Sequence, residues 1–310
     1  MTACVDSGCG PDYDARVRTE CPPAEDQSSG CSDPAREIFE QAADEIPGDL
    51  KYPFLTPRRL QNNIEKLQRE QGSSTVRLLV TGVDEASVDA VIRRLPFRRA
   101  TRVWYEADLD SAIIKLMPSS MHQVTSSQFC QEVSTEIHIL PGHGFLSLTS
   151  IGASKFSCPG RRNKEGDAGL RCPTRTGATA WPDLMIEVGY SESIRMPRLD
   201  AQWWLVASGG LTRIVILMKV KDRPVNSMHL EVWRFLPNPR VQRTRQAPSH
   251  IPTNTQTIKI DEAGVVAPVG ASLTIPYADL FDVGHVNAAD VVFTSAQLSQ
   301  FAQFVFLQCA

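Results

Sequence analysis

Apolar and polar residues alternate along this chain with two periods, one typical of helices and one of strands. In the first third, the pattern predicts helices over residues 35–46, 58–72 and 85–95, and a strand over residues 74–83. The helix at 85–95 carries Val88, Val91 and Ile92 on one face. Strand 74–83 and this helix therefore form an expected β-α unit.

The second half shows the same alternation. Helices are expected over residues 126–139, 195–208 and 294–308, and strands over 145–154, 181–188, 211–220 and 227–236. Residues 158–173 and the Pro-rich residues 236–258 are expected to be loops. Helices interspersed with strands predict an α/β fold with a mixed central sheet flanked by helices.

Charge divides the chain unevenly and helps to set its boundaries. The first 50 residues hold 12 acidic residues and 3 arginines, whereas the rest of the chain is mildly basic. We interpret residues 1–33 as a disordered acidic tail, followed by a helical and β-α region at 34–110. A core is expected at 111–236, with a loop and a C-terminal extension at 237–310 packed on it.

Composition and cysteine spacing favour an intracellular protein. The hydrophobic fraction is 42%, no apolar run approaches the roughly 20 residues that span a membrane, and the N-terminus has no secretory pattern. We therefore expect a cytoplasmic or nuclear location and no membrane partner. The N-terminal cysteines, among eight in the chain, form no CxxC pair, which argues against a zinc knuckle. In a chain without a secretory pattern we expect reduced thiols.

Carboxylates at the ends of apolar segments are the candidate chemistry. Asp183 and Glu187 lie on one expected strand, about 13 Å apart at roughly 3.3 Å per residue, too far to share an ion. Asp167 precedes Glu187 by 20 residues, a separation that suits neighbouring strands. Asp167 and Glu187 are therefore the expected ligands of a divalent cation, Mg²⁺ or Mn²⁺, which would activate water and polarise a phosphate.

A family resemblance rests on the order of these motifs. Asp167 is followed by WPDLMIEVG, SES, the helix LDAQWWLVASGG and the strand TRIVILMKV. Over about residues 115–235 this order resembles the PD-(D/E)XK superfamily of restriction-endonuclease-like nucleases, and is similar to uncharacterised fungal members. The resemblance implies a restriction-endonuclease-like core in which Asp167 and Glu187 bind the metal.

The chain departs from the family motif at several positions. Gly166 stands where the family has proline, and Gly189 stands where it has the lysine that orients the attacking water. Gln202 and Lys219 are the candidates for that lysine's role. The resemblance aligns the glutamate of the family's first helix with Gln123, which is therefore a further candidate metal ligand; Glu132 and Glu136 are the alternative candidates for this position.

Three functions remain open on these residues. The first is a metal-dependent nuclease acting on nucleic-acid phosphodiesters, with a basic loop that contacts phosphates through Arg161, Arg162, Lys164, Arg171 and Arg175. The second is an inactive core retained as a binding or scaffold module, which the altered motif favours. The third is a non-nuclease enzyme that uses Glu187 as an acid or base on a small fungal metabolite.

Overall fold

The computed structural model contains two large β-sheets that lie side by side, and a small two-stranded sheet. It describes residues 33–70, 74–117, 121–158, 161–177, 180–190, 192–222, 225–239, 248–281 and 289–308. The expected acidic tail before Asp33, with four of the cysteines, lies outside the described residues. Within these ranges, every helix is too short or too polar to cross a bilayer.

The larger sheet, called here the central sheet, runs in the order β13-β12-β11-β10-β9-β8-β5. Its strands are β5 (Thr149–Ser150), β8 (Ala168–Arg171), β9 (Leu184–Tyr190), β10 (Ile214–Lys221), β11 (Ser227–Pro237), β12 (His250–Ile260) and β13 (Val266–Ala267). Strands β9 and β10 are parallel and joined by α5 (Arg195–Ala207), while the other neighbours are antiparallel. Strand β9 is buried on both faces, which explains its nearly continuous apolar sequence.

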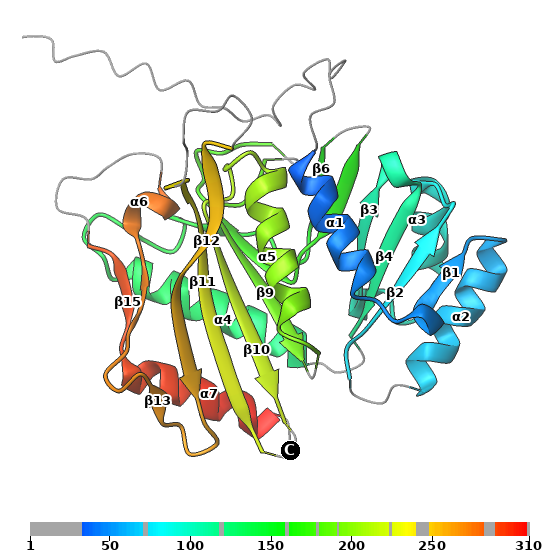
Figure 1. Cartoon of the computed structure of the whole chain (residues 1–310). Coiled ribbons are helices and arrows are strands. Elements are labelled where there is room, and N and C mark those ends of the chain that lie inside the picture. Colours follow the sequence, from blue (N-terminus) through cyan, green and yellow to red (C-terminus); the bar gives the residue numbers. More distant parts are fainter. Residues whose placement is uncertain are drawn as a thin grey trace, which may run out of the picture.

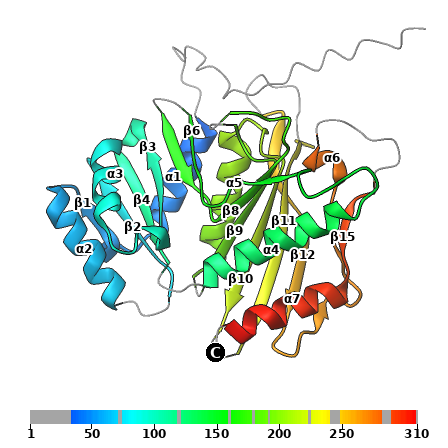
Figure 2. The same ribbon diagram turned by 180° about the vertical axis from the view of Figure 1, so that it is seen from behind.

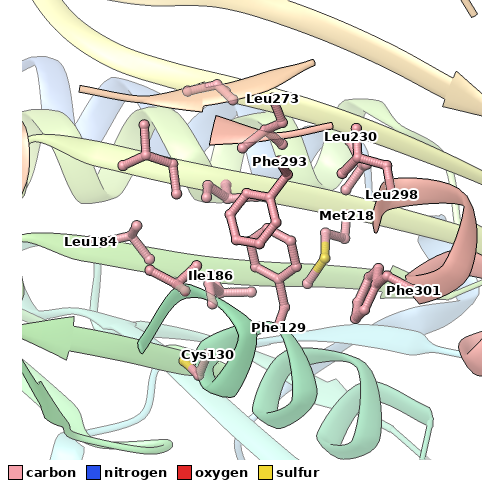
Figure 3. Packing of buried hydrophobic residues seen from close by; sticks show 14 of the residues in the cluster. Phe129, Cys130, Leu184, Ile186, Met218, Leu230, Leu273, Phe293, Leu298 and Phe301 are labelled. Carbon is pink, nitrogen blue, oxygen red and sulfur yellow. The ribbon is translucent and has the colours of Figure 1, made fainter. Parts of the chain in front are cut away.

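Helices cover both faces of the central sheet. Helix α5 lies on one face, whereas α4 (Met121–His138) and α7 (Ser295–Gln308) lie across the other (Figures 1 and 2). On the α4 side, Phe129 packs against Phe293 and Phe301 with ring centroids 5.3 and 5.2 Å apart (Figure 3). Alternation along β9 directs Ile186 into this cluster and Met185 toward α5.

The smaller sheet, called here the N-terminal sheet, has the order β1-β2-β4-β3-β7-β6. Its strands are β1 (Lys51–Pro53), β2 (Val76–Thr81), β3 (Thr101–Glu106), β4 (Ser111–Leu116), β6 (Lys155–Cys158) and β7 (Arg162–Glu165). Helices α2 (Pro57–Glu70) and α3 (Glu85–Arg94) share one hydrophobic core with it. Strands β6 and β7 come from the segment between β5 and β8, so a hairpin of the second half completes this sheet.

Smaller elements complete the described fold. Helix α1 (Pro34–Asp44) packs against α5 between the two sheets (Figure 1). The remaining elements are α6 (Tyr277–Leu280), the pair β14 (Leu273–Ile275) and β15 (Val291–Phe293), and the 3-10 helices η1 (Gly48–Leu50), η2 (Arg98–Ala100) and η3 (Ala107–Leu109).

The expected α/β class with mixed sheets is confirmed, and several expected loops prove to be strands. Residues 158–173 contain β7 and β8, and residues 250–258 belong to β12. Arg162 and Lys164 of β7 are buried with ionic partners on other elements, whereas β12 keeps exposed polar residues along much of its length. The boundary expected after residue 110 falls immediately before β4, which pairs with β2 and β3.

Candidate functional site

The antiparallel pairing of β8 and β9 brings Asp167 to the same region as Glu187. Asp167 immediately precedes β8, and Ala168 pairs with Ile186. The Asp167 carboxylate accepts a hydrogen bond from the Val188 amide at 2.9 Å. Asp183, at the other end of the strand, is instead buried beside Arg175 and accepts from the Cys172 amide at 2.8 Å.

A lysine from the N-terminal sheet lies between the two expected metal ligands. The Nζ atom of Lys115, on β4, lies 3.0 Å from Asp167 Oδ2 and 3.7 Å from Glu187 Oε2. The side chains of Lys115, Asp167 and Glu187 are 6%, 1% and 3% exposed. The ammonium therefore occupies the position between carboxylates where the sequence predicts a divalent cation.

A second lysine, Lys164 on β7, lies on the other side of Glu187. Its Nζ is 3.8 Å from Glu187 Oε1 and donates to Asp200, on α5, at 2.6 Å. It also lies 4.5 Å from the ring centroid of Trp104, a cation–π contact. Glu187 Oε1 accepts a further hydrogen bond from Trp204 Nε1 at 2.6 Å.

Two arginines extend the same pattern. Arg77, on β2, donates to both Asp200 oxygens at 2.6 and 3.2 Å and to Glu192 at 2.9 and 3.4 Å. Arg102, on β3, lies 3.6 Å from Asp167 Oδ1 and donates to the Gly166 carbonyl. Two-pronged contacts of this kind suit the forked guanidinium group.

Charge at this centre is segregated by sheet. The cations Arg77, Arg102, Lys115 and Lys164 all belong to the N-terminal sheet, whereas the carboxylates Asp167, Glu187, Glu192 and Asp200 lie on or next to the central sheet and α5. We call these eight side chains the buried charge network. A buried ion requires compensation, so each sheet neutralises the charges that the other brings to the interface.

Burial and neighbouring charges move the two central carboxylates in opposite directions. Burial raises the pKa of Glu187 to about 7, although Lys164 counteracts it. Burial also acts on Asp167, but Lys115 and His122 outweigh it and hold the pKa of Asp167 well below its usual range. Burial lowers the pKa of His122, whose Nδ1 lies 3.7 Å from Asp167. The region thus holds one firmly ionised carboxylate and one that protonates near neutrality.

Packing explains Gly166 and Gly189, the two glycines at which the sequence departs from the motif it resembles. A Cβ atom on Gly189 would lie 2.8 Å from Cγ of the Pro197 ring and 3.2 Å from Glu192 Oε1. A Cβ on Gly166 would lie 1.9 Å from the Met185 methyl and 3.0 Å from Trp204. The Pro197 ring is rigid, so the position of the family's lysine has no room for that side chain.

The other metal or catalytic candidates lie around the network. Gln123 is exposed on α4, and its buried neighbour His122 faces Asp167 instead. Gln202 is half-buried on α5, where the adjacent turn places Asp200 in the network. Lys219 pairs with Gly189 on the same sheet face as Glu187, but the ammonium groups within 4 Å of Glu187 are those of Lys115 and Lys164.

Residues of the expected phosphate-binding loop are held by protein groups. Arg161 lies 3.2 Å from Asp33, and buried Arg162 pairs with Asp33 and with Glu106. Arg171 donates to the carbonyl groups of Gly177 and Ala180. The arginines of this loop therefore hold α1 and neighbouring loops in place.

The residues that line this centre do not fit a divalent cation. The cavity lined by Lys115, Lys164 and Glu187 measures about 10 Å³, room for roughly one water. Within the described ranges no three His, Cys, Asp or Glu side chains gather in a way that could hold a metal. The Lys115 ammonium already lies within 3.7 Å of both the Asp167 and the Glu187 carboxylates, so an ion would have to displace it.

Sequence reasoning missed Arg77, Lys115 and Asp200, and two of them leave a signal. Arg77 in VRLLV and Lys115 in AIIKL are single cations within apolar runs. Such a residue on a buried strand needs an anionic partner.

Comparisons of the chain with protein-family models and with curated proteins give no match.

Proposed function

We propose that this chain is a PD-(D/E)XK-like protein that binds nucleic acid without cleaving it, because its carboxylate centre is neutralised by its own cations. The order of elements supports this proposal. Helix α4, strands β5, β8 and β9, helix α5 and strand β10 occur in the order that the resemblance implies, with the hairpin β6–β7 inserted between β5 and β8. Asp167 lies at the start of β8 and Glu187 lies within β9, as the two acidic motifs require.

The single observation that carries the proposal is the position of Lys115 between Asp167 and Glu187. Metal-dependent phosphodiester hydrolysis needs a cation with open coordination positions for water and a phosphate oxygen. An ammonium group neutralises carboxylates but offers no such position. A cavity of about 10 Å³ likewise has no room for a phosphodiester or a small metabolite at this centre.

A cleavage assay on the intact chain tests this proposal. Labelled single-stranded DNA, duplex DNA and RNA would be incubated with Mg²⁺ or Mn²⁺, beside a matched Asp167→Ala/Glu187→Ala variant. We expect no difference in cleavage between the two proteins. Metal-dependent cleavage by the natural chain that the double substitution abolishes would refute the proposal.

One observation favours a second candidate, an active nuclease whose basic group comes from the N-terminal sheet. The Nζ atoms of Lys115 and Lys164 lie 3.7 and 3.8 Å from Glu187 carboxylate oxygens, so this sheet supplies the basic group that Gly189 lacks. In this case cleavage would be lost in Lys115→Met or Lys164→Met variants. The first proposal predicts no activity for these substitutions to remove.

A further inference from the structure

An exposed arginine cluster stands apart from the buried charge network. Arg93 and Arg94 end helix α3, and Arg98 and Arg99 begin the 3-10 helix η2, so four arginines fall within seven residues. All four are exposed. Between them Phe97 packs against the hydrophobic core of the N-terminal sheet. We call these four arginines the arginine corner. Phe97 anchors the connection between α3 and η2 to the core.

The arginine corner lacks the acidic partners that hold the other arginines of this sheet. Arg93 reaches Asp89 only at 4.0 Å, with its side chain 67% exposed. Among the residues that the structure describes, Arg94, Arg98 and Arg99 have no carboxylate within 4 Å. Cations in the last turn of a helix interact favourably with its dipole, which accounts for Arg93 and Arg94. It does not account for Arg98 and Arg99, which lie beyond the helix.

The corner is joined directly to the buried charge network. The guanidinium of Arg102 donates from Nη1 to the Arg99 carbonyl at 2.9 Å and from Nε to the Gly166 carbonyl at 3.0 Å. Its Nε also lies 3.6 Å from Asp167. Arg102 is only 12% exposed, so its hydrogen bond to the Arg99 carbonyl connects the surface corner with the buried charge network.

We propose that the arginine corner binds the phosphate backbone of nucleic acid. Arginine donates in a planar fork that matches phosphate oxygens, and all four cations are arginines rather than lysines. Lipid phosphates offer the same charge, but membrane surfaces also take up apolar side chains. None of the large apolar residues that the structure shows exposed lies between residues 85 and 102. The corner therefore fits a soluble polyanion read through its backbone, without base contacts.

This inference rests on the proposed function only in its choice of nucleic acid as the partner, and binding is measured separately from cleavage. Fluorescence anisotropy of a labelled 20-base-pair duplex in EDTA would follow binding by the full chain as salt is varied. The corner variant replaces Arg93, Arg94, Arg98 and Arg99 with glutamine. The matched control replaces with glutamine four other exposed cations, on helix α2, which packs against the same sheet: Arg58, Arg59, Lys66 and Arg69.

We expect the corner variant to bind at least about tenfold more weakly than the natural chain, and its slope of log K against log salt to flatten by about 3. The α2 control, with the same change in net charge, should keep most of the affinity. Thermal melts would verify that both variants fold. Equal losses in the two variants, or no duplex binding by the natural chain at 50 mM salt, would overturn this inference.

Two further outcomes separate this inference from the proposed function. Tighter binding to vesicles of phosphatidylserine and phosphatidylcholine than to the duplex would also overturn the assignment to nucleic acid. Metal-dependent cleavage would refute the proposed function but would leave the EDTA binding result intact. Loss of binding in the corner variant alone would support the corner whether or not the chain cleaves.

Discussion

Lys115 and Asp167 form hydrogen bonds with the backbone of the same residue, Val188. The Val188 amide donates to Asp167 at 2.9 Å, its carbonyl accepts from Lys115 Nζ at 3.0 Å, and the two side chains are themselves 3.0 Å apart. The pairing of β8 with β9 ends level with Ile186. The Lys115 and Asp167 side chains therefore satisfy the Val188 carbonyl and amide, which lie beyond the first residue of β8. Their contact also joins the two sheets there.

Replacing Lys115 should destabilise the protein strongly. Lys115→Met leaves the Asp167 charge buried with less compensation, and removing one partner of a buried pair costs about 3–5 kcal/mol. Urea unfolding followed by circular dichroism would measure the free energy of unfolding. Lys219→Met, on a strand of the central sheet and without a carboxylate within 4 Å among the described residues, is the control and should cost less than about 1 kcal/mol. A similar small loss for Lys115→Met would contradict the role assigned to it.

Arg77 and Asp200 should be strongly coupled. Their two hydrogen bonds are buried, with side chains 7% and 2% exposed. In a double-mutant cycle of Arg77→Met and Asp200→Leu, we expect a coupling energy of at least about 2 kcal/mol in unfolding experiments. The exposed pair Lys155 and Glu85 should give no more than about 1 kcal/mol. Equal couplings for the two pairs would show that burial adds nothing to the interaction.

The pH dependence of stability should change when Glu187 is replaced by glutamine. Burial raises the pKa of Glu187 from its ordinary value of 4.5 to about 7. Between these values the folded chain keeps a proton that the unfolded chain has lost, so this group's contribution to stability falls as pH rises. Relative to the natural chain, Glu187→Gln should thus gain a few kcal/mol in unfolding free energy between pH 4.5 and pH 7.

The same comparison contains its own control. Glu106 and Glu165, whose pKa values burial also raises, are present in both proteins and cancel in the difference. Denaturant unfolding at half-unit pH steps would give that difference. A gap between the two proteins that stays constant across this range would show that Glu187 is ionised throughout.

Placing at position 189 the lysine that the proposed resemblance calls for should not confer nuclease activity. Gly189→Lys places a Cβ atom 2.8 Å from the Pro197 ring, and overpacking a buried site costs about 1–3 kcal/mol. Gly144→Ala, where a Cβ meets nothing within 4 Å, is the control and should be nearly neutral. Thermal unfolding and the cleavage assay would be run on both variants. Metal-dependent cleavage by the Gly189→Lys protein would show that a missing lysine alone had silenced the centre.

Local pattern predicts much of this fold because its helices are amphipathic and its central strands are apolar. The helix at 85–95 and the strands at 211–220 and 227–236 are confirmed as α3, β10 and β11. The placement of Asp167 near Glu187 also follows from strand geometry. Strand β7, which reads RNKE, carries no apolar alternation, since its side chains are buried by ion pairs with distant residues.

The buried charge network lies beyond local sequence reasoning for a related reason. Lys115 and Asp167 are 52 residues apart, and Arg77 and Asp200 are 123 residues apart. A charge within an apolar run signals that a partner exists, but only the packing of the two sheets identifies it. His122 and Gln123, neighbours on α4, show the same limit of sequence reasoning. The rotation of α4 about its axis decides which of the two faces Asp167.

The hairpin β6–β7 sets the order in which this protein can be assembled. Because β7 pairs with β3 along Trp104–Glu106, a chain that stops after β4 presents an open edge on β3 and lacks Lys164. A growing polypeptide must extend through α4 and reach residue 165 before that sheet can close. The N-terminal sheet thus takes strands from both halves of the chain, so the halves are not independent domains in sequence order. A fragment cut between β4 and α4 should expose the edge of β3, which would be prone to pair with another copy. An evolutionary exchange of whole domains at the connection between β4 and α4 would break the pairing of β7 with β3.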